Sequence, residues 1–493
     1  MDLMNHRAGF EDFYFYGDYT KEKYLSDDLG TSLIKAMPKQ IYEPNTVTAY
    51  SNFSTDLAGY IVECVTKEKL YNYLQENIFT PVGMDSTSAN PRYDELDYIV
   101  DNKAMGYGED VEGKGWTYLN LYPDGSINGT ATDLAKFAMA LMEDNSPLFE
   151  KSKTTEELFS TSYSRDSQLS GCAHGFWEGK GENIYYHHDG GHDGFTTIYG
   201  FSPDTQSGVI VLTNTGDEPY IPYGVMQLVM GDNQEIDLVP CEDGIDAMTL
   251  DHMEFLTARK NQGDLTKVYS YISGNDKITA VNHNTIIYHG LTYIQTAPNY
   301  FQLADHGDNL IARGVYGELY FGDIDGDGKI DVLNGGGISS SDSLKAKVVD
   351  TNVGLIIQLI LGGLSFLVII MSGFRMFLEK LKKKNMLIKN EFNMDKNSIR
   401  KLTICGIGLL INMLILIAFI LSPDGFSNVL RINIQVGINL VIGIVSIILL
   451  GTRIFMFIKN EEIRTFKIKH SVVIALMIIL ILMWKWNFFM FIL

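Results

Sequence analysis

The pattern of hydrophobic positions divides the chain into two parts near residue 350. Four long apolar runs follow that point, at about residues 353–374, 402–421, 434–458 and 472–493. A helix needs about 20 apolar residues to cross the hydrocarbon core of a bilayer, and each run is close to that length. We therefore expect four transmembrane helices within residues 351–493, with membrane lipid as their partner.

The loops between these runs differ in charge. The first loop carries nine Lys and Arg residues, the second carries only Arg431, and the third carries five when the helix end leading into it is included. Because cytoplasmic loops are enriched in Lys and Arg, the first and third loops are expected inside the cell. The pattern predicts a multi-pass protein of a cell membrane, with residues 1–350 extracellular.

The front of the chain mixes helical and strand-like spacing. Apolar residues recur at helical spacing in residues 54–66 and 131–142, whereas residues 185–213 alternate as three consecutive antiparallel strands would. Short strand-like runs rich in Tyr and Phe fill residues 245–345. We expect an α+β domain at residues 1–235 and a small β-rich domain at residues 245–345.

Charge and cysteine content exclude several classes of protein. The formal net charge is −21; residues 351–493 hold 16 basic and 6 acidic residues, and the front holds 23 and 54. An acidic front argues against nucleic-acid binding, which needs a basic surface. The cysteines show no Cys-x-x-Cys spacing, so neither a zinc ribbon nor a disulfide framework is expected. They are Cys64, Cys172, Cys241 and Cys405.

Four stretches, in order, resemble segments of the β-lactamase-related serine hydrolases, which include class C β-lactamases and penicillin-binding proteins. Residues 1–10 resemble the LLxHTSGF segment, 49–87 the YSN-helix-PLGM stretch, 125–141 the GxxxTxxDLAKF helix and 187–214 the final HxG and strand-pair region. The resemblance implies a β-lactamase/transpeptidase-like fold, in which helices pack on an antiparallel sheet. It also implies acyl transfer or hydrolysis at an amide or ester, with no cofactor.

The first motif that carries chemistry is Tyr50-Ser51-Asn52. Acyl transfer needs a serine that attacks the carbonyl, groups that move protons, and donors that hold the oxyanion. By resemblance to the Tyr-x-Asn motif, Tyr50 is the proton-transfer residue and Asn52 contacts the substrate amide. The alternative is a loop tyrosine followed by an asparagine at the start of a helix.

The second motif is His188-Asp189-Gly190, which matches His-x-Gly. A register that begins at His187 fails, because its third position is Asp189 where the motif needs glycine. By resemblance, His188 and Gly190 line the wall opposite the nucleophile, and the amide of Gly191 is an oxyanion donor. The alternative is a surface histidine on an edge strand.

The Ser-x-x-Lys motif of the family is not found at its expected place. That place lies before the segment that begins this chain, so we expect the nucleophilic Ser and its Lys to be absent. Two other Ser-x-x-Lys strings occur, Ser32 to Lys35 and Ser398 to Lys401, and we expect neither to be the nucleophile. Residues 1–10 also lack a signal peptide, so we expect an N-terminally incomplete domain. A truncated gene, a split gene and a decayed pseudoenzyme all remain open.

Two groups of residues suggest metal ions. A histidine-rich group could bind a metal, but the His-x-Gly resemblance explains it better; it consists of His187, His188, Asp189, His192 and Asp193. A second group has the spacing of a calcium loop, with Gly328 at position 6 and Asn334 where position 12 needs Glu; its acidic members are Asp323, Asp325, Asp327 and Asp331. The alternative for the second group is an Asp-Gly turn between two strands.

Two functional hypotheses follow. The first is a membrane-anchored extracellular serine hydrolase acting on a small-molecule or peptidoglycan-peptide substrate, such as a D-alanyl peptide or a β-lactam. On this hypothesis the present chain is inactive, because its nucleophile is missing. The alternative is a catalytically dead binding or sensor module for peptidoglycan or β-lactam, which would bind its ligand without covalent capture.

Overall fold

The described part of the protein forms two compact units. The computed structural model describes residues 1–11, 19–20, 28–108, 113–115, 117–181, 183–216, 219–231, 238–258, 276–305, 317–336, 341–384, 394–420, 429–459 and 468–489. The first unit comprises Met1–Lys260 and Asn275–Ala346, and the second includes Lys347–Leu493. The regions expected at 1–235 and 245–345 thus lie within one compact unit.

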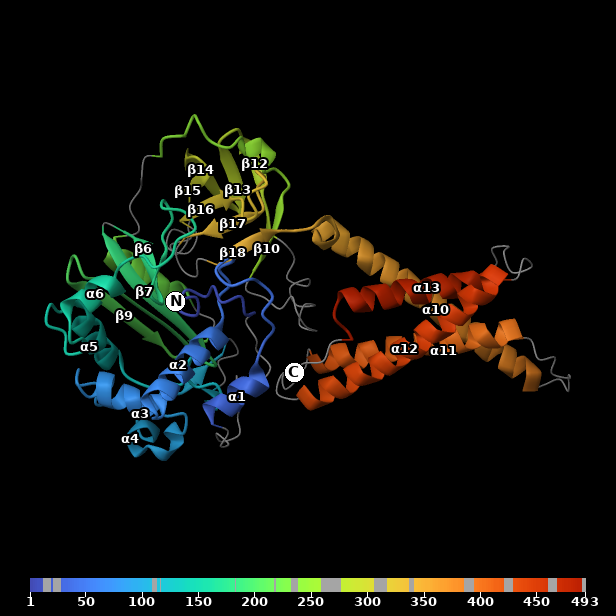
Figure 1. Ribbon diagram of the computed structural model, residues 1–493, viewed down its shortest axis with the longest axis horizontal. Helices are drawn as coiled ribbons and strands as arrows, with labels where there is room; N and C mark the ends of the chain where they lie inside the picture. Colours follow the sequence, from blue (N-terminus) through green and yellow to red (C-terminus); the bar gives the residue numbers. More distant parts are fainter. Residues whose placement is uncertain are drawn as a thin grey trace. The chain divides into compact units, whose positions relative to one another are not determined.

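A five-stranded antiparallel sheet forms the centre of the first unit's hydrolase-like part (Figure 1). Its strands follow one another in sequence order: β5 (Cys172–Ala173), β6 (Phe176–Lys180), β7 (Ile184–His192), β8 (Phe195–Ser202) and β9 (Ser207–Thr213). The three strands expected within residues 185–213 are β7, β8 and β9. Gly194, with φ of +84°, closes the tight turn between β7 and β8, a backbone conformation that suits glycine.

Helices pack on both faces of this sheet. Tyr223 and Met226 of α7 (Tyr220–Met230) pack against Ile198 on one face. Ala138 of α5 (Ala131–Met142) belongs to a cluster with Phe201 on the other face. Burying a large apolar side chain contributes about 1.5–3 kcal/mol relative to leaving it exposed. The other described helices of this part are α1 (Leu29–Ala36), α2 (Asn52–Thr66), α3 (Leu70–Leu74), α4 (Asp97–Val100) and α6 (Ser152–Leu158).

This part also contains two small two-stranded sheets. β1 (Tyr19–Thr20) pairs with β4 (Tyr118–Leu119), and β2 (Gly106–Tyr107) pairs with β3 (Gly113–Lys114). Tyr107 also forms a bridge to Thr215, and its amide donates to the carbonyl of Asn214. The loop that holds β2 is thereby attached to the segment after β9.

The β-rich part of the first unit is a nine-stranded sheet in the order β11-β10-β18-β17-β16-β15-β14-β13-β12. Its core holds the fully buried Phe255, Tyr293, Phe301 and Phe321. The strands are β10 (Glu254–Thr257), β11 (Asp276–Lys277), β12 (Thr279–Asn282), β13 (Thr285–Tyr288), β14 (Leu291–Ala297), β15 (Tyr300–Asp305), β16 (Glu318–Gly322), β17 (Val332–Gly335) and β18 (Asp342–Lys345).

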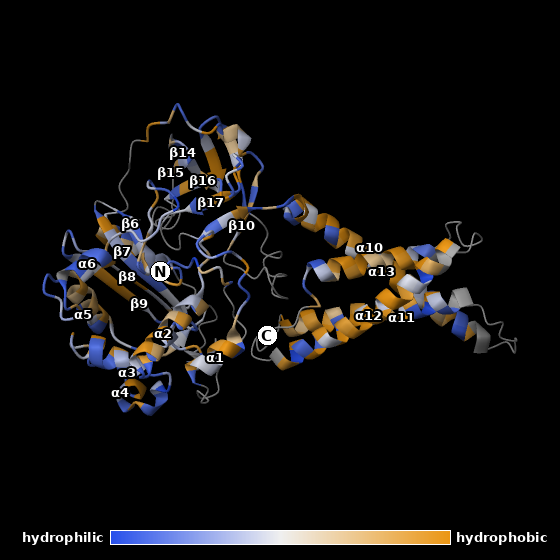
Figure 2. Ribbon diagram, in the orientation of Figure 1, coloured by the Kyte–Doolittle hydropathy of each residue, from blue (hydrophilic) through white to orange (hydrophobic). Residues whose placement is uncertain are grey.

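The second unit is helical, and its helices are mainly apolar (Figure 2). They are α10 (Asn352–Lys384), α11 (Met394–Ile420), α12 (Val429–Lys459) and α13 (Ile468–Lys485). Among the described residues three helices are long and apolar enough to cross a membrane, at Asn352–Leu381, Asn397–Ile420 and Leu430–Phe455. The apolar stretch of α13 is shorter, at His470–Lys485. The expected count of four spans therefore stays a prediction.

Candidate active site

Tyr50 and Asn52 lie on either side of the cap that begins α2. Ser51 is the N-cap: its backbone is extended, and its side chain accepts a hydrogen bond from the Ser54 amide at 3.3 Å. Serine is favoured there because its oxygen satisfies an amide that has no partner within the helix. The cap ends the extended segment at Tyr50, which is half-buried, and starts the helix at Asn52.

The buried side chain of His6 also forms a hydrogen bond to the backbone of this cap. Its Nδ1 accepts a hydrogen bond from the Ser51 amide at 3.2 Å, so the neutral ring carries its proton on Nε2. The ring of His6 lies 4.4 Å from that of Tyr50 and 5.5 Å from that of Trp177, measured between centroids. The segment at residues 1–10 thereby meets the Tyr-x-Asn motif.

Trp177 on β6 extends this group to the second motif. Its ring centroid lies 6.3 Å from that of Tyr50 and 6.1 Å from that of His188, which it stacks against. We call the four residues His6, Tyr50, Trp177 and His188 the ring cluster. It brings together Tyr50 and His188, which the sequence analysis placed in one site on separate grounds.

The glycines after His188 leave the backbone of β7 accessible. A Cβ at Gly190 would come within 2.7 Å of Thr197 Oγ1, so a side chain there would displace its neighbour. A Cβ at Gly191 would meet nothing within 4 Å, and Gly191 is exposed. The backbone expected to face a substrate is therefore open at Gly191 and free of side chains at both positions.

His187 and Asp189, the two neighbours of His188, do not belong to the ring cluster. His187 is fully buried next to Gly200, and neither ring nitrogen has a hydrogen-bond partner. Burial lowers the pKa of His187 to about 3, with a further contribution from His188. Burial first, and then the charge of Asp189, raises the pKa of Tyr223 on α7. Asp189 thus faces α7.

The two Ser-x-x-Lys strings differ in their surroundings. Ser32 lies on α1 with none of its surface exposed, and its hydroxyl has no hydrogen-bond partner, while Lys35 is exposed. Ser398 and Lys401 lie on α11, in the other unit. A nucleophile must be accessible to its substrate, which the buried Ser32 is not, and Ser398 belongs to a different compact unit from Tyr50.

The histidine-rich group forms no converging set of ligands. Among the described residues, ligand atoms of three or more His, Cys, Asp or Glu residues converge only at Asp323, Asp325 and Asp327, where they lie within 4.8 Å of one another. His188 Nδ1 instead lies 2.6 Å from the Asp189 carbonyl oxygen.

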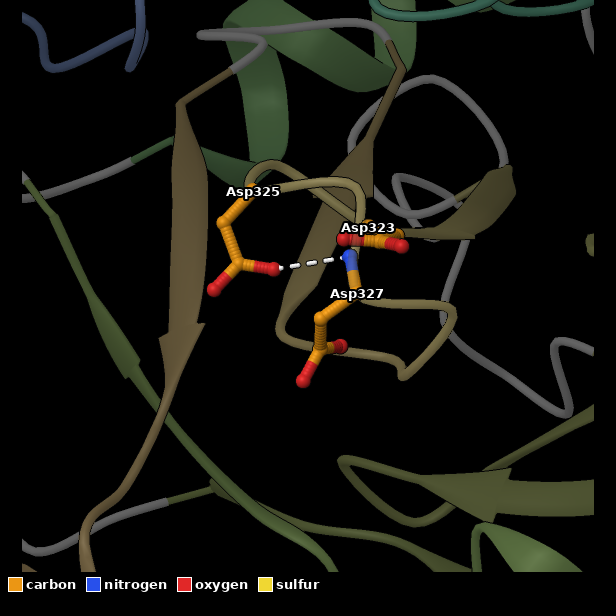
Figure 3. Close-up of side chains that lie close together, drawn as sticks. All are labelled: Asp323, Asp325 and Asp327. Atoms are coloured by element: carbon orange, nitrogen blue, oxygen red, sulfur yellow. Dashed lines mark hydrogen bonds between the residues drawn. The ribbon is translucent and has the colours of Figure 1, made fainter.

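The loop with calcium-like spacing joins two paired strands, β16 and β17. Its carboxylates accept hydrogen bonds from the loop itself: Asp323 accepts from the Gly328 amide at 2.6 Å, and Asp325 accepts from the Asp327 amide at 3.1 Å (Figure 3). The Asp-Gly turn accounts for these contacts. Asp331 accepts from the Ile324 amide instead, and calcium binding stays a prediction.

The family of the front part follows from comparison with known proteins. A family model described as Beta-lactamase matches residues 1–223. Residues 1–223 form a domain of the beta-lactamase family. This match confirms the β-lactamase/transpeptidase-like fold that the four ordered stretches implied. The beta-lactamase domain contains the whole ring cluster.

Curated relatives share part of their length with this chain. Penicillin-binding protein 4* of Bacillus subtilis is 24% identical over 243 residues, which cover 46% of this chain and 53% of that protein. A protein of Escherichia coli named "Putative D-alanyl-D-alanine carboxypeptidase" is 36% identical over 93 residues, covering 18% and 21%. The chain thus spans about half the length, or less, of these relatives.

Solved structures also match. A penicillin-binding protein from Bacillus halodurans is 23% identical, covering 46% of this chain and 71% of that one, with a TM-score of 0.38. A class C beta-lactamase mutant is 16% identical, covering 44% and 65%, with a TM-score of 0.36.

The sequence analysis did not assign a role to three residues that the structure places around the site. They are His6, Trp177 and Tyr223. His6 lies in the stretch that resembles LLxHTSGF, so the signal for it was present. Trp177 lies in a strand-like run and Tyr223 in an apolar helix, and both patterns are typical of core residues. Only the tertiary fold connects them to Tyr50.

Proposed function

We propose that this chain is a membrane-anchored protein of a bacterial cell, with the beta-lactamase domain outside. Three helices long and apolar enough to span a membrane support the anchor. The excess of Lys and Arg in the first and third expected loops supports this orientation.

The proposed ligands are acyl compounds: D-alanyl peptides of peptidoglycan, or β-lactams. The observation that carries this is the ring cluster, in which Tyr50 and His188 come from different motifs and meet around Trp177. In this proposal Tyr50 transfers protons, Asn52 contacts the ligand's amide, and the Gly191 amide donates to the carbonyl oxygen of the ligand. The names of the relatives, penicillin-binding protein and D-alanyl-D-alanine carboxypeptidase, support the same ligand class.

We further propose that the chain as it stands does not turn its ligand over. Hydrolysis in this family needs a serine nucleophile, and Ser32 is fully buried while Ser398 belongs to the other unit. The second candidate function is a binding or sensor module for peptidoglycan or β-lactam. The ring cluster supports this candidate too, because reversible binding of a ligand does not need a serine nucleophile.

Covalent labelling tests both candidates. Membranes containing this chain, and membranes containing a version extended upstream in the same reading frame, are treated with a fluorescent penicillin and a fluorophosphonate. Labelling of the extended version alone supports a hydrolase whose nucleophile lies upstream. Reversible penicillin binding with no label in either version supports the sensor. If this chain labels and Ser32→Ala abolishes the label, the proposed site is wrong.

A further inference from the structure

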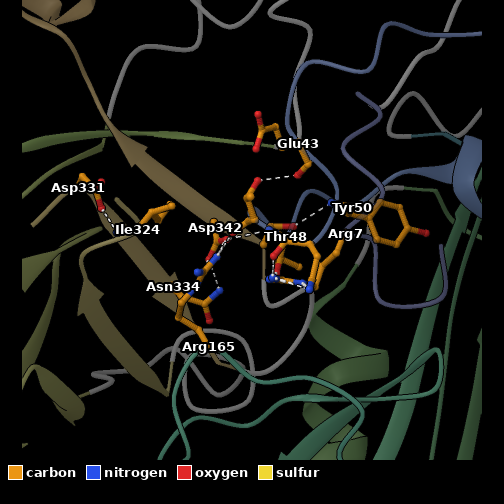
Figure 4. A network of polar contacts seen from close by, with 12 residues as sticks. Arg7, Glu43, Thr48, Tyr50, Arg165, Ile324, Asp331, Asn334 and Asp342 are labelled. Carbon is orange, nitrogen blue, oxygen red and sulfur yellow. Dashed lines mark hydrogen bonds and ion pairs between the residues drawn. The ribbon is translucent and has the colours of Figure 1, made fainter. Parts of the chain in front are cut away.

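The extended segment before Tyr50 pairs with the β-rich part of the unit. The Thr48 amide donates to the Asp342 side chain at 2.8 Å, and the Asp342 amide donates to the Thr48 carbonyl at 2.8 Å (Figure 4). Asp342 is the first residue of β18. A strand of the β-rich part is therefore hydrogen-bonded to the residues that precede the Tyr-x-Asn motif.

The Asp342 carboxylate is completely buried, and both of its oxygens accept hydrogen bonds. Besides the Thr48 amide, it accepts from Asn334 Nδ2 at 2.8 Å and from Arg165 Nε at 3.2 Å, and it forms an ion pair with Arg165 Nη2. Burial is the largest single influence on the pKa of Arg165 and lowers it, but the charge and hydrogen bond of Asp342, together with the nearby Tyr163 and Asp331, outweigh burial and raise this pKa. Buried charges persist only when they are paired and hydrogen-bonded, so this carboxylate fixes the groups around it.

Arg165 and Arg7 form further hydrogen bonds to the extended segment before Tyr50. Arg165 Nη2 donates to the Thr46 carbonyl at 3.0 Å, and Arg7 Nη1 donates to Thr48 Oγ1 at 3.2 Å. Both guanidinium groups lie over the ring of Tyr163, at 3.6 Å for Arg7 and 5.9 Å for Arg165. Arg7 directly follows His6, so the same group of charges also anchors the segment that carries His6 of the ring cluster.

Tyr50 itself receives the last contact from the β-rich part. Its amide donates to Ser341 Oγ at 3.4 Å, and Ser341 precedes Asp342. The next amide, of Ser51, is bonded to His6. The backbone of Tyr50 is therefore held between the β-rich part on one side and His6 on the other.

We propose that Asp342 is a positioning residue, which sets the place of the Tyr50 ring from the β-rich part by fixing residues 46–50. Asp342 lies in a different part of the unit from every residue of the ring cluster, so it acts through the segment and not on a ligand. The β-rich part is thus a component of the site. The expected effect of Asp342 on ligand binding rests on the proposed function, whereas its effect on the position of the Tyr50 ring does not.

The test follows the Tyr50 ring directly. 3-Fluorotyrosine is introduced at position 50 of the full chain in lipid nanodiscs, and its fluorine NMR resonance is recorded in the parent protein and in Asp342→Asn. We expect the resonance to shift and broaden in D342N, because the carboxylate that pairs with Thr48 and Arg165 loses its charge. Reversible binding of a fluorescent penicillin is expected to weaken at least about tenfold, equivalent to about 1.4 kcal/mol.

Glu318→Gln is the matched control. Glu318 is another buried carboxylate of the β-rich part, and it accepts from the Ser170 amide and from Lys180, 3.3 Å away, both in the beta-lactamase domain. It contacts the domain as Asp342 does, but at residues distant in sequence from the Tyr50 segment. We expect E318Q to leave the fluorine resonance at its parent position. An equal shift in E318Q and D342N would overturn the proposal in favour of general loosening.

A milder variant keeps the test decisive if D342N does not fold. Ser341→Ala removes only the acceptor for the Tyr50 amide, and we expect a smaller shift in the same direction. A folded D342N, or S341A where D342N is unfolded, whose resonance stays at the parent position overturns the proposal. If the parent protein binds no penicillin, the proposed ligand fails, while the fluorine comparison still decides the role of Asp342.

Discussion

Two acidic groups of the same β-rich sheet differ in what they do. Asp342 is fully buried, and its partners come from residues as distant in the chain as Thr48 and Arg165. Asp325 and its neighbours in the β16–β17 loop are exposed, and their partners lie within a few residues. A carboxylate fixes distant parts of a fold when water is excluded from it and its donors come from elsewhere in the chain.

The largest expected effect is that of Asp342→Ala on stability. Removing one partner of a buried ion pair typically costs about 3–5 kcal/mol, because the remaining charge stays buried. Here the remaining charge is Arg165, whose side chain is 14% exposed. Urea denaturation of the full chain in detergent measures the loss. The comparison fails if D342A unfolds at the same urea concentration as the parent protein.

His187 shows what burial does to a polar group that has no partner. Its pKa of about 3 lies below the value of about 6.5 expected for the unfolded chain, so between these values the unfolded state binds more protons. The free energy of unfolding is therefore unaffected by this group above about pH 6.5. Below that pH it decreases by about 1.4 kcal/mol per pH unit, because the unfolded state gains a proton that the buried ring does not accept. At pH 5 the expected loss is about 2 kcal/mol.

Comparison with His187→Phe measures this contribution. The variant keeps a buried ring but cannot be protonated, so its stability should fall less than that of the parent protein between pH 7 and pH 5. If the stability of H187F and of the parent protein depends equally on pH, the His187 ring is accessible to protons in the folded state and this explanation is wrong.

Glu318→Gln gives an intermediate effect and separates stability from positioning. Glu318 accepts from Tyr300 as well as from the Ser170 amide, and the glutamine keeps one carbonyl oxygen for these donors. We expect a loss of about 1–2 kcal/mol, in the range for one weakened buried hydrogen bond. The midpoint of urea denaturation checks it. A loss as large as that of D342A would mean that all buried carboxylates at this junction are equivalent.

The local structure around these residues was predictable to different extents. Helical spacing predicted the helix at 131–142, which is α5, and alternation predicted β7 to β9. The Asp-rich spacing identified the loop between β16 and β17, because its hydrogen bonds are local. Periodicity and turn chemistry report such short-range contacts well.

The support for Tyr50 was not predictable in the same way. The motif identified Tyr50, but Asp342 and Trp177 reach it only through tertiary contacts. Asp342 follows a serine-rich stretch that looks like a surface loop, and only its complete burial reveals its role. Hydrophobic periodicity alone also does not show that His187 is buried and His188 only half-buried. The strand register decides this, and the His-x-Gly spacing suggested that register.

The smallest expected effect is that of Asp325→Asn in the exposed loop. The amide oxygen of asparagine can still accept from the Asp327 amide, so the turn keeps its hydrogen bond. In calcium-free buffer we expect a change in unfolding free energy within about 0.5 kcal/mol, as for most surface substitutions. A loss comparable to that of D342A would break the contrast between the two acidic groups. Calcium that raises the melting temperature of the parent protein, and not of D325N, would give the loop a role that its own hydrogen bonds do not require.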